Sequence, residues 1–396
     1  MGLSLFEASL FICTAIFGVG VVSLPSAFKS LGCIFGVGAY CFVGILTLFT
    51  IFLISSTLKT VKRTDYTYND LFSIKYPYLG NILDYIIVLG GILSCMMYTE
   101  HLVKWFNTLF EGLIPTHNTF SAAIILFPLF FLSSKKEYKN LRYISYISVF
   151  SVFLFAFFIL YYFFKLKDKL QVNIKLYNYD FDSGISRFIL SMGCQKSIIN
   201  IYNAMNKPSV RYISYASIIS IIFVTCIYTT IGLCGYICFG DRCDDTIITL
   251  FCNKNFYKNN LIERTTFNLI APKILIFSFF ISLCGSYCFQ IYPTRIALFS
   301  IFKRNFNFQN ENVLRISTSL GVCIFNFICI MFNLDLKLLI TLSGGTIATI
   351  LCYTMPTLLY LTVNRKNIVI TALATIVCIL SFAFILKILI HTIKSL

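Results

Sequence analysis

The chain has 396 residues, of which 58% are hydrophobic and only 12% are charged. Soluble domains average about 25% charged residues, so this chain lacks the polar sequence that would cover a soluble surface. Its formal net charge is +16. The basic residues lie in short segments between long apolar runs, where they face anionic lipid headgroups, and we expect no nucleic-acid partner. The composition therefore predicts a polytopic α-helical protein embedded in a lipid bilayer.

Apolar runs of roughly 20 residues recur end to end, as membrane-spanning helices require. They predict about eleven transmembrane helices, at residues 4–28, 34–57, 79–106, 118–133, 141–164, 186–204, 212–238, 270–292, 312–332, 336–361 and 367–393. The polar stretches between them are too short for a soluble domain. Residues 1–396 are therefore expected to form a single all-α-helical transmembrane domain, and we expect it to act as a monomer.

Short loops on the N-terminal side of the membrane hold most of the short-loop Lys and Arg residues, beginning with Lys59, Lys62 and Arg63. Such residues stay in the cytoplasm during insertion. We expect a cytoplasmic N-terminus and, because the number of spans is odd, a C-terminus on the opposite side. Of the sixteen cysteines, Cys243 and Cys252 share the longest polar loop, where a disulfide can form.

The first span contains an interruption in the sequence Gly18–Pro25, with glycines at positions 18 and 20 and a proline at its end. Glycine and proline weaken a helix interior by about 1 and 3 kcal/mol. Unwound backbone at membrane depth must line a cavity or be buried in protein. Its free N–H groups and the dipole of the second half-helix can hold a carboxylate. Ordinary helix packing is the alternative role for these glycines.

The sixth span contains a second interruption, where Gly193 is flanked by Ser191, Gln195 and Lys196 inside an apolar run. Polar residues at membrane depth are costly and commonly functional. Lys196 either serves as an anion site or extends its amine to the interface. Spans one and six are five apart, and broken helices at matching positions of two five-helix halves indicate a transporter binding site.

The chain resembles the amino acid/auxin permease family, in particular its vacuolar and system A/N-like branch. The resemblance rests on short motifs in the expected order. They are Gly18–Phe28, Gly193–Gln195, Ile201–Ser209, Gly235–Asp241, Tyr292–Arg295 and Ser343–Thr346 with Pro356. It implies a LeuT-like fold, in which two inverted five-helix repeats precede one extra helix and helices one and six are broken. It also implies a secondary active transporter of amino acids that works by alternating access.

The substrate site is expected at the two breaks, because helix N-termini attract anions and C-terminal carbonyls attract cations. The carboxylate would lie on the first break and the ammonium on the second. The candidate substrate-binding residues are Gly18, Val19, Gly20, Val21, Val22, Ser23, Ser191, Met192, Gly193, Cys194 and Gln195.

Coupling to protons is favoured over coupling to sodium, because Thr14 stands where the sodium-coupled branch carries Asn. Hydroxyl groups of the first and eighth spans could still supply oxygen ligands. Asp84 and Glu100 in the third span could bind a proton, although Glu100 can also pair with Lys104 one turn later. The candidate ion-coupling residues are Thr14, Ile16, Phe17, Ser282, Ser286 and Glu100. No other cofactor and no bound metal are expected.

The sequence also disfavours several other classes of function. The three histidines are scattered, and the sequence contains neither a Gly-rich nucleotide loop nor a Gly-x-Ser-x-Gly motif, so an enzyme or ATP-driven pump is disfavoured. The sequence also shows no recognisable selectivity filter, so a channel is disfavoured. A sodium-coupled transporter and a non-transporting amino-acid sensor of the same fold remain alternatives. The sequence leaves both the vacuolar and the plasma membrane open.

Overall fold

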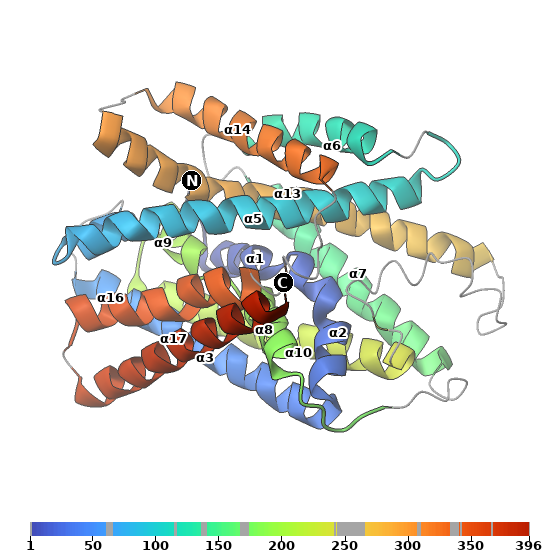
Figure 1. Ribbon diagram of the computed structural model, residues 1–396, viewed down its shortest axis with the longest axis horizontal. Coiled ribbons are helices and arrows are strands. Elements are labelled where there is room, and N and C mark those ends of the chain that lie inside the picture. Colours follow the sequence, from blue (N-terminus) through green and yellow to red (C-terminus); the bar gives the residue numbers. More distant parts are fainter. Residues whose placement is uncertain are drawn as a thin grey trace.

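The computed structural model describes residues 2–60, 66–114, 117–135, 141–166, 174–240, 243, 266–306, 310–332, 340, 343–365 and 367–395. Within these ranges the chain is almost entirely helical, and the only extended pairing is an isolated bridge between Leu3 and Met205. The helices run side by side along the long axis of the molecule, as Figure 1 shows. The architecture is a helical bundle, as the composition predicts.

The first half of the chain forms the following elements: α1 (Leu5–Ile16), the 3₁₀ turn η1 (Val19–Ser23), α2 (Leu24–Leu31), α3 (Cys33–Thr60), α4 (Tyr68–Ser73), α5 (Pro77–Leu109), α6 (Asn118–Ser133), α7 (Arg142–Leu166), α8 (Phe181–Ser191) and α9 (Gln195–Ala204). The second half forms α10 (Val210–Phe239), α13 (Thr266–Phe306), α14 (Glu311–Met331), the π-helical segments η4 (Ser343–Ala348) and η5 (Ile350–Thr354), α16 (Met355–Val363) and α17 (Ile368–Ser395).

The number of spans fits the prediction of about eleven. In the described residues, 8 segments are long and apolar enough to cross a bilayer, and one pair bent by 53°, formed by α1 and the segment Val19–Leu31, adds a broken span. The short apolar helix α6 and the interrupted pair α8–α9 supply the other two. Both predicted breaks are therefore present.

Between the second and third spans the chain forms the short helix α4, which begins at a capping box formed by Thr67 and Asp70. One predicted boundary was wrong. The eighth span was expected to end at residue 292, before Pro293, yet α13 continues to Phe306 with that proline inside it. Packing along α5 provides tertiary support for this long helix. The apolar pattern of the sequence cannot anticipate such support, because it depends on a distant helix.

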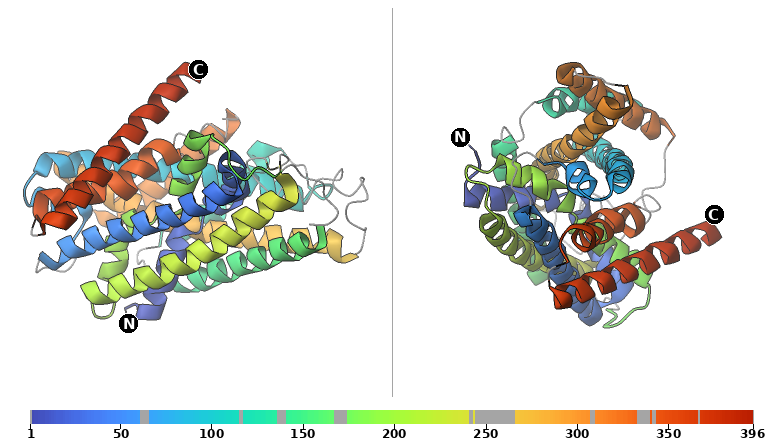
Figure 2. Two further views of the ribbon diagram at one scale, coloured as in Figure 1. Left: turned by 90° about the horizontal axis from the view of Figure 1, so that it is seen from below. Right: turned by 90° about the vertical axis from the view of Figure 1, so that its left-hand side faces the viewer.

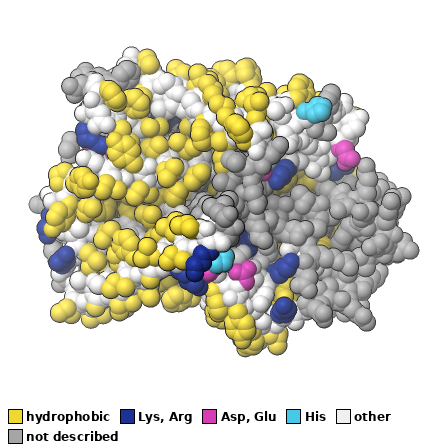
Figure 3. All heavy atoms as spheres, in the orientation of Figure 1, with side chains coloured by type: hydrophobic (Ala, Val, Ile, Leu, Met, Phe, Trp, Pro, Cys, Tyr) yellow, Lys and Arg dark blue, Asp and Glu magenta, His cyan; other side chains and the backbone are white. Residues whose placement is uncertain are grey.

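The broken helices lie inside the bundle, while the last helix lies at its edge. Every residue from 11 to 28 is buried, and α1 contacts α7, α9, α10 and α13. By contrast, only 22% of the most apolar window of α17 is buried, and its C-terminal end projects from the bundle in Figure 2. Hydrophobic side chains cover most of the described part of the face in Figure 3. Such a surface suits lipid contact and leaves the interior for the breaks.

Candidate functional site

The first break lies between the end of α1 and the beginning of η1. Phe17 and Gly18 leave the helix, with φ and ψ angles of −68° and 106° at the former and −154° and −159° at the latter. The ends of the two half-helices leave backbone N–H and C=O groups without helical partners. Pro25 lies in the first turn of α2, where proline interrupts no hydrogen bond. The break is thus at Gly18, while the proline starts the next helix.

The two glycines of the first break allow close contacts that a side chain would prevent. A Cβ atom at Gly18 would overlap the Tyr98 hydroxyl oxygen of α5. A Cβ atom at Gly20 would lie 2.6 Å from the Cα atom of Ser191, at the end of α8. The space beside Gly20 is therefore filled by the backbone of the second break. The two interruptions are in direct contact.

The second break lies between Ser191 and Gln195 and is held by side-chain hydrogen bonds. The Gln195 carboxamide accepts a hydrogen bond from the Cys194 N–H at 3.0 Å and donates one to Thr50 Oγ1 of α3, also at 3.0 Å. The Tyr68 hydroxyl of α4 donates to the Gln195 carbonyl. Gln195 was predicted to bind substrate, but both ends of its carboxamide already have partners within the protein. Its side chain anchors the break to α3.

A cavity of about 50 Å³ lies between the two breaks, which we call the central cavity. Six of the predicted site residues line it: Ile16, Gly18, Val19, Gly20, Gly193 and Gln195. Helix α5, helix α13 and the π-helical segments η4 and η5 complete the lining. Five spans therefore converge on one small space at the interrupted backbone.

The other predicted substrate residues lie outside the lining of the central cavity. They are Val21, Val22, Ser23, Ser191, Met192 and Cys194, all buried in the surrounding helices. The Ser23 hydroxyl donates to the Gly20 carbonyl at 2.9 Å, and the Ser191 hydroxyl donates to the Phe188 carbonyl at 2.8 Å. Both hydroxyl groups therefore stabilise their own helix ends.

Sequence reasoning missed four polar residues of the central cavity, Ser94, Tyr98, Gln290 and Ser343. The Gln290 amide donates to the Tyr98 hydroxyl oxygen at 3.2 Å, which leaves the hydroxyl hydrogen available. The other amide atom, Gln290 Oε1, is buried and has no hydrogen-bond partner in the described structure. An amide inside the apolar eighth span was a usable signal. Tyr98 has no such signal, because tyrosine is common throughout this chain.

The candidate coupling residues lie around the first break, except for Glu100. The Ser286 hydroxyl of α13 donates to the Phe17 carbonyl and also lies 3.2 Å from the Ser282 carbonyl. Thr14 is fully buried, and its hydroxyl donates to the Leu10 carbonyl at 2.8 Å within α1. The first and eighth spans therefore meet at the first break, where the Thr14 and Ser286 hydroxyl groups each donate to a backbone carbonyl.

Glu100 lies apart from these groups. Its carboxylate forms an ion pair with Lys104 at 3.1 Å, one turn further along α5, and it does not line the central cavity. This arrangement is the pairing that the spacing of the two residues allows. The structure therefore provides no geometric support for a coupling role of Glu100.

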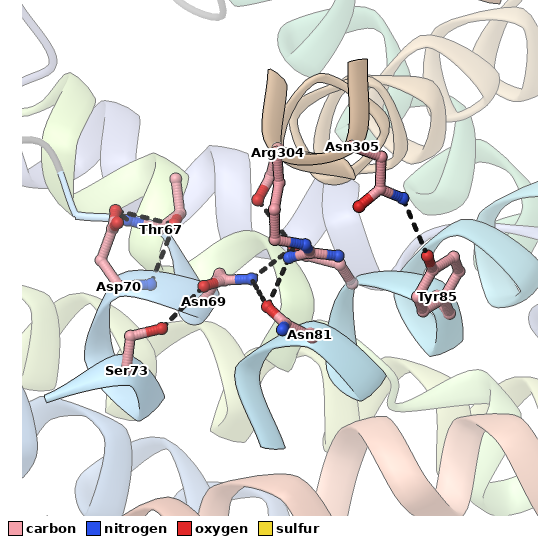
Figure 4. Close-up of polar contacts among 10 residues, drawn as sticks. Thr67, Asn69, Asp70, Ser73, Asn81, Tyr85, Arg304 and Asn305 are labelled. Carbon is pink, nitrogen blue, oxygen red and sulfur yellow. Dashed lines mark hydrogen bonds and ion pairs between the residues drawn. The ribbon is translucent and has the colours of Figure 1, made fainter. Parts of the chain in front are cut away.

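A polar network joins α4, α5 and α13 at the N-terminal side of the bundle (Figure 4). The Asp84 carboxylate accepts hydrogen bonds from Asn69 at 2.5 Å and Ser300 at 2.7 Å and lies 3.7 Å from the Arg304 guanidinium. Arg304 also donates to Asn81. On the same side, Glu7 forms an ion pair with Arg142 at 2.8 Å. Charged groups therefore connect the helix ends on the N-terminal side of the bundle.

On the opposite side, backbone hydrogen bonds join the segment before α8 to the turn between α2 and α3. The N–H groups of Cys33 and Ile34 donate to the carbonyls of Lys175 and Leu176, both at 3.1 Å, and the Asn178 N–H donates to the Leu31 carbonyl at 3.0 Å. The predicted Cys243–Cys252 disulfide involves residue 252, which lies outside the described residues. Among the described residues, no group of three His, Cys, Asp or Glu side chains could hold a metal ion.

Comparison with known proteins identifies the family to which the chain is similar. Residues 1–394 match the profile of the family described as "Transmembrane amino acid transporter protein". The chain is 20% identical to Vacuolar amino acid transporter 5 of Schizosaccharomyces pombe, over 91% of this chain and 85% of that protein. It is 24% identical to Vacuolar amino acid transporter 6 of Saccharomyces cerevisiae, over 76% of this chain and 66% of that protein.

Solved structures confirm the fold. A manganese transporter of Eremococcus coleocola aligns with a TM-score of 0.67 at 12% identity, over 97% of this chain and 86% of its own. MhsT in complex with L-phenylalanine aligns with a TM-score of 0.63 at 13% identity, over 98% of both chains. The fold is therefore LeuT-like. Together with the match over residues 1–394, this shows that the chain is a multi-pass membrane transporter, not an enzyme, and belongs to the transmembrane amino acid transporter family.

Proposed function

We propose that this protein carries amino acids across a membrane by alternating access and binds them in the central cavity. The observation that carries the proposal is the convergence of both helix breaks on one cavity with unpaired polar groups. The N–H groups of Val19 and Gly20 begin the second half of span one, where a helix attracts a carboxylate. The Tyr98 hydroxyl points toward the same break and can donate to that carboxylate.

The ammonium of the amino acid would lie at the second break. The last carbonyls of α8 point toward Gly193, because a Cβ atom there would lie 3.6 Å from the Leu190 oxygen. The unpaired oxygen of Gln290 offers a further acceptor. Carbonyls at a helix C-terminus carry partial negative charge and stabilise a cation. The two charged ends of one amino acid therefore match the two breaks.

The experiment is uptake of the twenty amino acids by the purified chain in proteoliposomes, with and without Tyr98→Phe. We expect saturable uptake of at least one amino acid and a loss of about tenfold or more in Tyr98→Phe, from one charge-assisted hydrogen bond. Uptake that is absent for every amino acid under every gradient would contradict the proposed function. Normal uptake by Tyr98→Phe would contradict the proposed position of the carboxylate.

The same proposal includes coupling to a proton gradient, with no other cofactor. Thr14 supports this choice, because it stands where the sodium-coupled branch of the family carries Asn. Uptake should follow an imposed pH gradient and ignore replacement of sodium by choline. Strict sodium dependence without a pH response would favour the sodium-coupled alternative.

We further propose a vacuolar location with the N-terminus in the cytoplasm, acting as a monomer. The names of two relatives support the location, and the basic short loops support the orientation. Tags at the two ends of the chain should show opposite protease accessibility in sealed vesicles, with the N-terminal tag on the cytoplasmic face. Equal accessibility of both tags would contradict the topology.

A further inference from the structure

Lys196 lies in the first turn of α9, directly after the second break. The residue is only 8% exposed. It lines the central cavity, and it also lines a smaller cavity of about 20 Å³ that contains Tyr68, Asp84 and Asn200. Lys196 therefore stands at the boundary between the central cavity and the polar network of the N-terminal side.

No described residue forms a hydrogen bond or an ion pair with the Lys196 amine. The carboxylate of Asp84 lines the smaller cavity together with Lys196, but its hydrogen-bond and ion-pair partners are Asn69, Ser300 and Arg304. The amine is therefore buried without a hydrogen-bond or ion-pair partner among the described residues.

This placement is unfavourable for a lysine that has only a structural role. A buried charge without a partner destabilises a protein strongly. The N-terminal turn of a helix carries partial positive charge, so a cation there is repelled further. The amine and the helix N-terminus together make this position electropositive. An anion that binds beside the amine would relieve both unfavourable effects.

The charges of the central cavity identify that anion. Among the described residues that line it, Lys196 is the one basic side chain, and none is acidic. The backbone charges of an amino acid already match the two breaks, its carboxylate at Val19–Gly20 and its ammonium near Gly193. A neutral amino acid would therefore leave Lys196 uncompensated, whereas a substrate with one additional carboxylate would neutralise it.

We propose that Lys196 is a specificity-determining residue that selects amino acids with an acidic side chain, its amine binding the side-chain carboxylate. The proposal rests on the proposed function, since it places the substrate in the central cavity. It goes beyond that function by assigning the substrate class. The lysine forms this contact only after an acidic amino acid has entered the cavity.

The test compares aspartate and glutamate with their amides, asparagine and glutamine, because each pair differs mainly in one charge. Uptake and competition are measured for the full chain in proteoliposomes, for the wild type, Lys196→Met and Lys196→Arg. The matched control is Lys387→Met, because Lys387 pairs with Asp182 at 2.6 Å and its side chain is 60% exposed. Wild-type protein should prefer the acids over the amides by about tenfold or more, as one charge-assisted hydrogen bond provides.

Lys196→Met should lose this preference and retain uptake of asparagine, Lys196→Arg should retain part of it, and Lys387→Met should retain all of it. Two results would overturn the proposal while leaving the proposed function intact. One is wild-type uptake of neutral amino acids without competition by aspartate or glutamate. The other is an equal loss of every substrate in Lys196→Met, which would assign the lysine to the common carboxylate or to the fold.

The competition measurement on the wild type can still overturn the proposal if the lysine variants do not fold, because it needs no substitution. Absence of uptake for all amino acids would instead contradict the proposed function itself. The two failures are therefore distinguishable.

Discussion

The two broken spans reach the same cavity by different physical means. The first break depends on missing side chains, because Gly18 and Gly20 let the backbone approach Tyr98 and Ser191 more closely than any Cβ atom allows. The second break depends on side chains that are present, because Gln195 bonds to Thr50 and Cys194 and accepts a hydrogen bond from Tyr68. The glycine of the second break, Gly193, has far more room, since a Cβ atom there would lie 3.3 Å from its nearest neighbour, Cys352 Sγ.

We infer from this difference that the two breaks have different roles in binding. The tight contact of the first break leaves no room for the substrate to displace its backbone, so its N–H groups are held in position before binding. The second break is held by hydrogen bonds that can be exchanged, and it carries two polar side chains, Gln195 and Lys196. We therefore expect the first break to fix the common part of the substrate and the second to adjust the selectivity.

The largest expected effect follows from Gly20→Val. Its Cβ atom would lie 2.6 Å from the Ser191 Cα atom, and this neighbour is backbone that cannot rotate away. Overpacking typically costs about 1–3 kcal/mol even where side chains can move. We expect no measurable uptake by protein that has reached the membrane, measured against Gly38→Val, whose Cβ meets nothing within 4 Å. Normal uptake by Gly20→Val would show that the two breaks need not touch.

Gln195→Ala should have the next largest effect. It removes the acceptor of the Cys194 N–H and the donor to Thr50 Oγ1, and each buried group left without a partner costs about 1–3 kcal/mol. We expect roughly tenfold lower uptake together with a lower melting temperature in detergent. Thr50→Val removes one of the same bonds and should be milder. Equal effects of Thr50→Val in the wild type and in Gln195→Ala would show that the pair does not act as a unit.

Ser286→Ala should have a moderate effect on the first break. It removes the hydroxyl that donates to the Phe17 carbonyl. The buried carbonyl is then left without this donor, which costs about 1–3 kcal/mol of stability. We expect a severalfold loss of uptake with an unchanged response to sodium. Ser217→Ala is the matched control, because the Ser217 hydroxyl bonds within its own helix, to the Ile213 carbonyl at 2.7 Å. Sodium stimulation that disappears in Ser286→Ala would instead identify Ser286 as an ion ligand.

Gly193→Ala should have the smallest effect and sharpens the comparison most directly. The new methyl group would meet Cys352 Sγ at 3.3 Å, a side-chain contact that a shift of a few tenths of an ångström relieves. We expect a change in transport below about 1 kcal/mol, or roughly fivefold, measured as the concentration for half-maximal uptake. A loss as large as that of Gly20→Val would mean that both breaks depend equally on the absence of a side chain.

Much of the fold was predictable because a bilayer imposes simple rules on a sequence. Apolar runs of about 20 residues locate the spans, and polar or glycine-rich interruptions within them locate the breaks. These are local properties of the chain. The residues Gly18, Val19, Gly20, Gly193 and Gln195 were therefore placed at the central cavity without any knowledge of packing.

Other features required the tertiary structure, because they depend on contacts between distant segments. Examples are the position of Tyr98 against Gly18, the pairing of Gln195 with Thr50, and the place of Lys196 between two cavities. Each depends on how different helices pack together. A helix can direct a residue to any side of a bundle until its neighbours are known. The sequence by itself determined where the membrane helices lie and where two of them break. Only the packing of five spans around those breaks decided which polar groups find partners in the protein and which are left for a substrate.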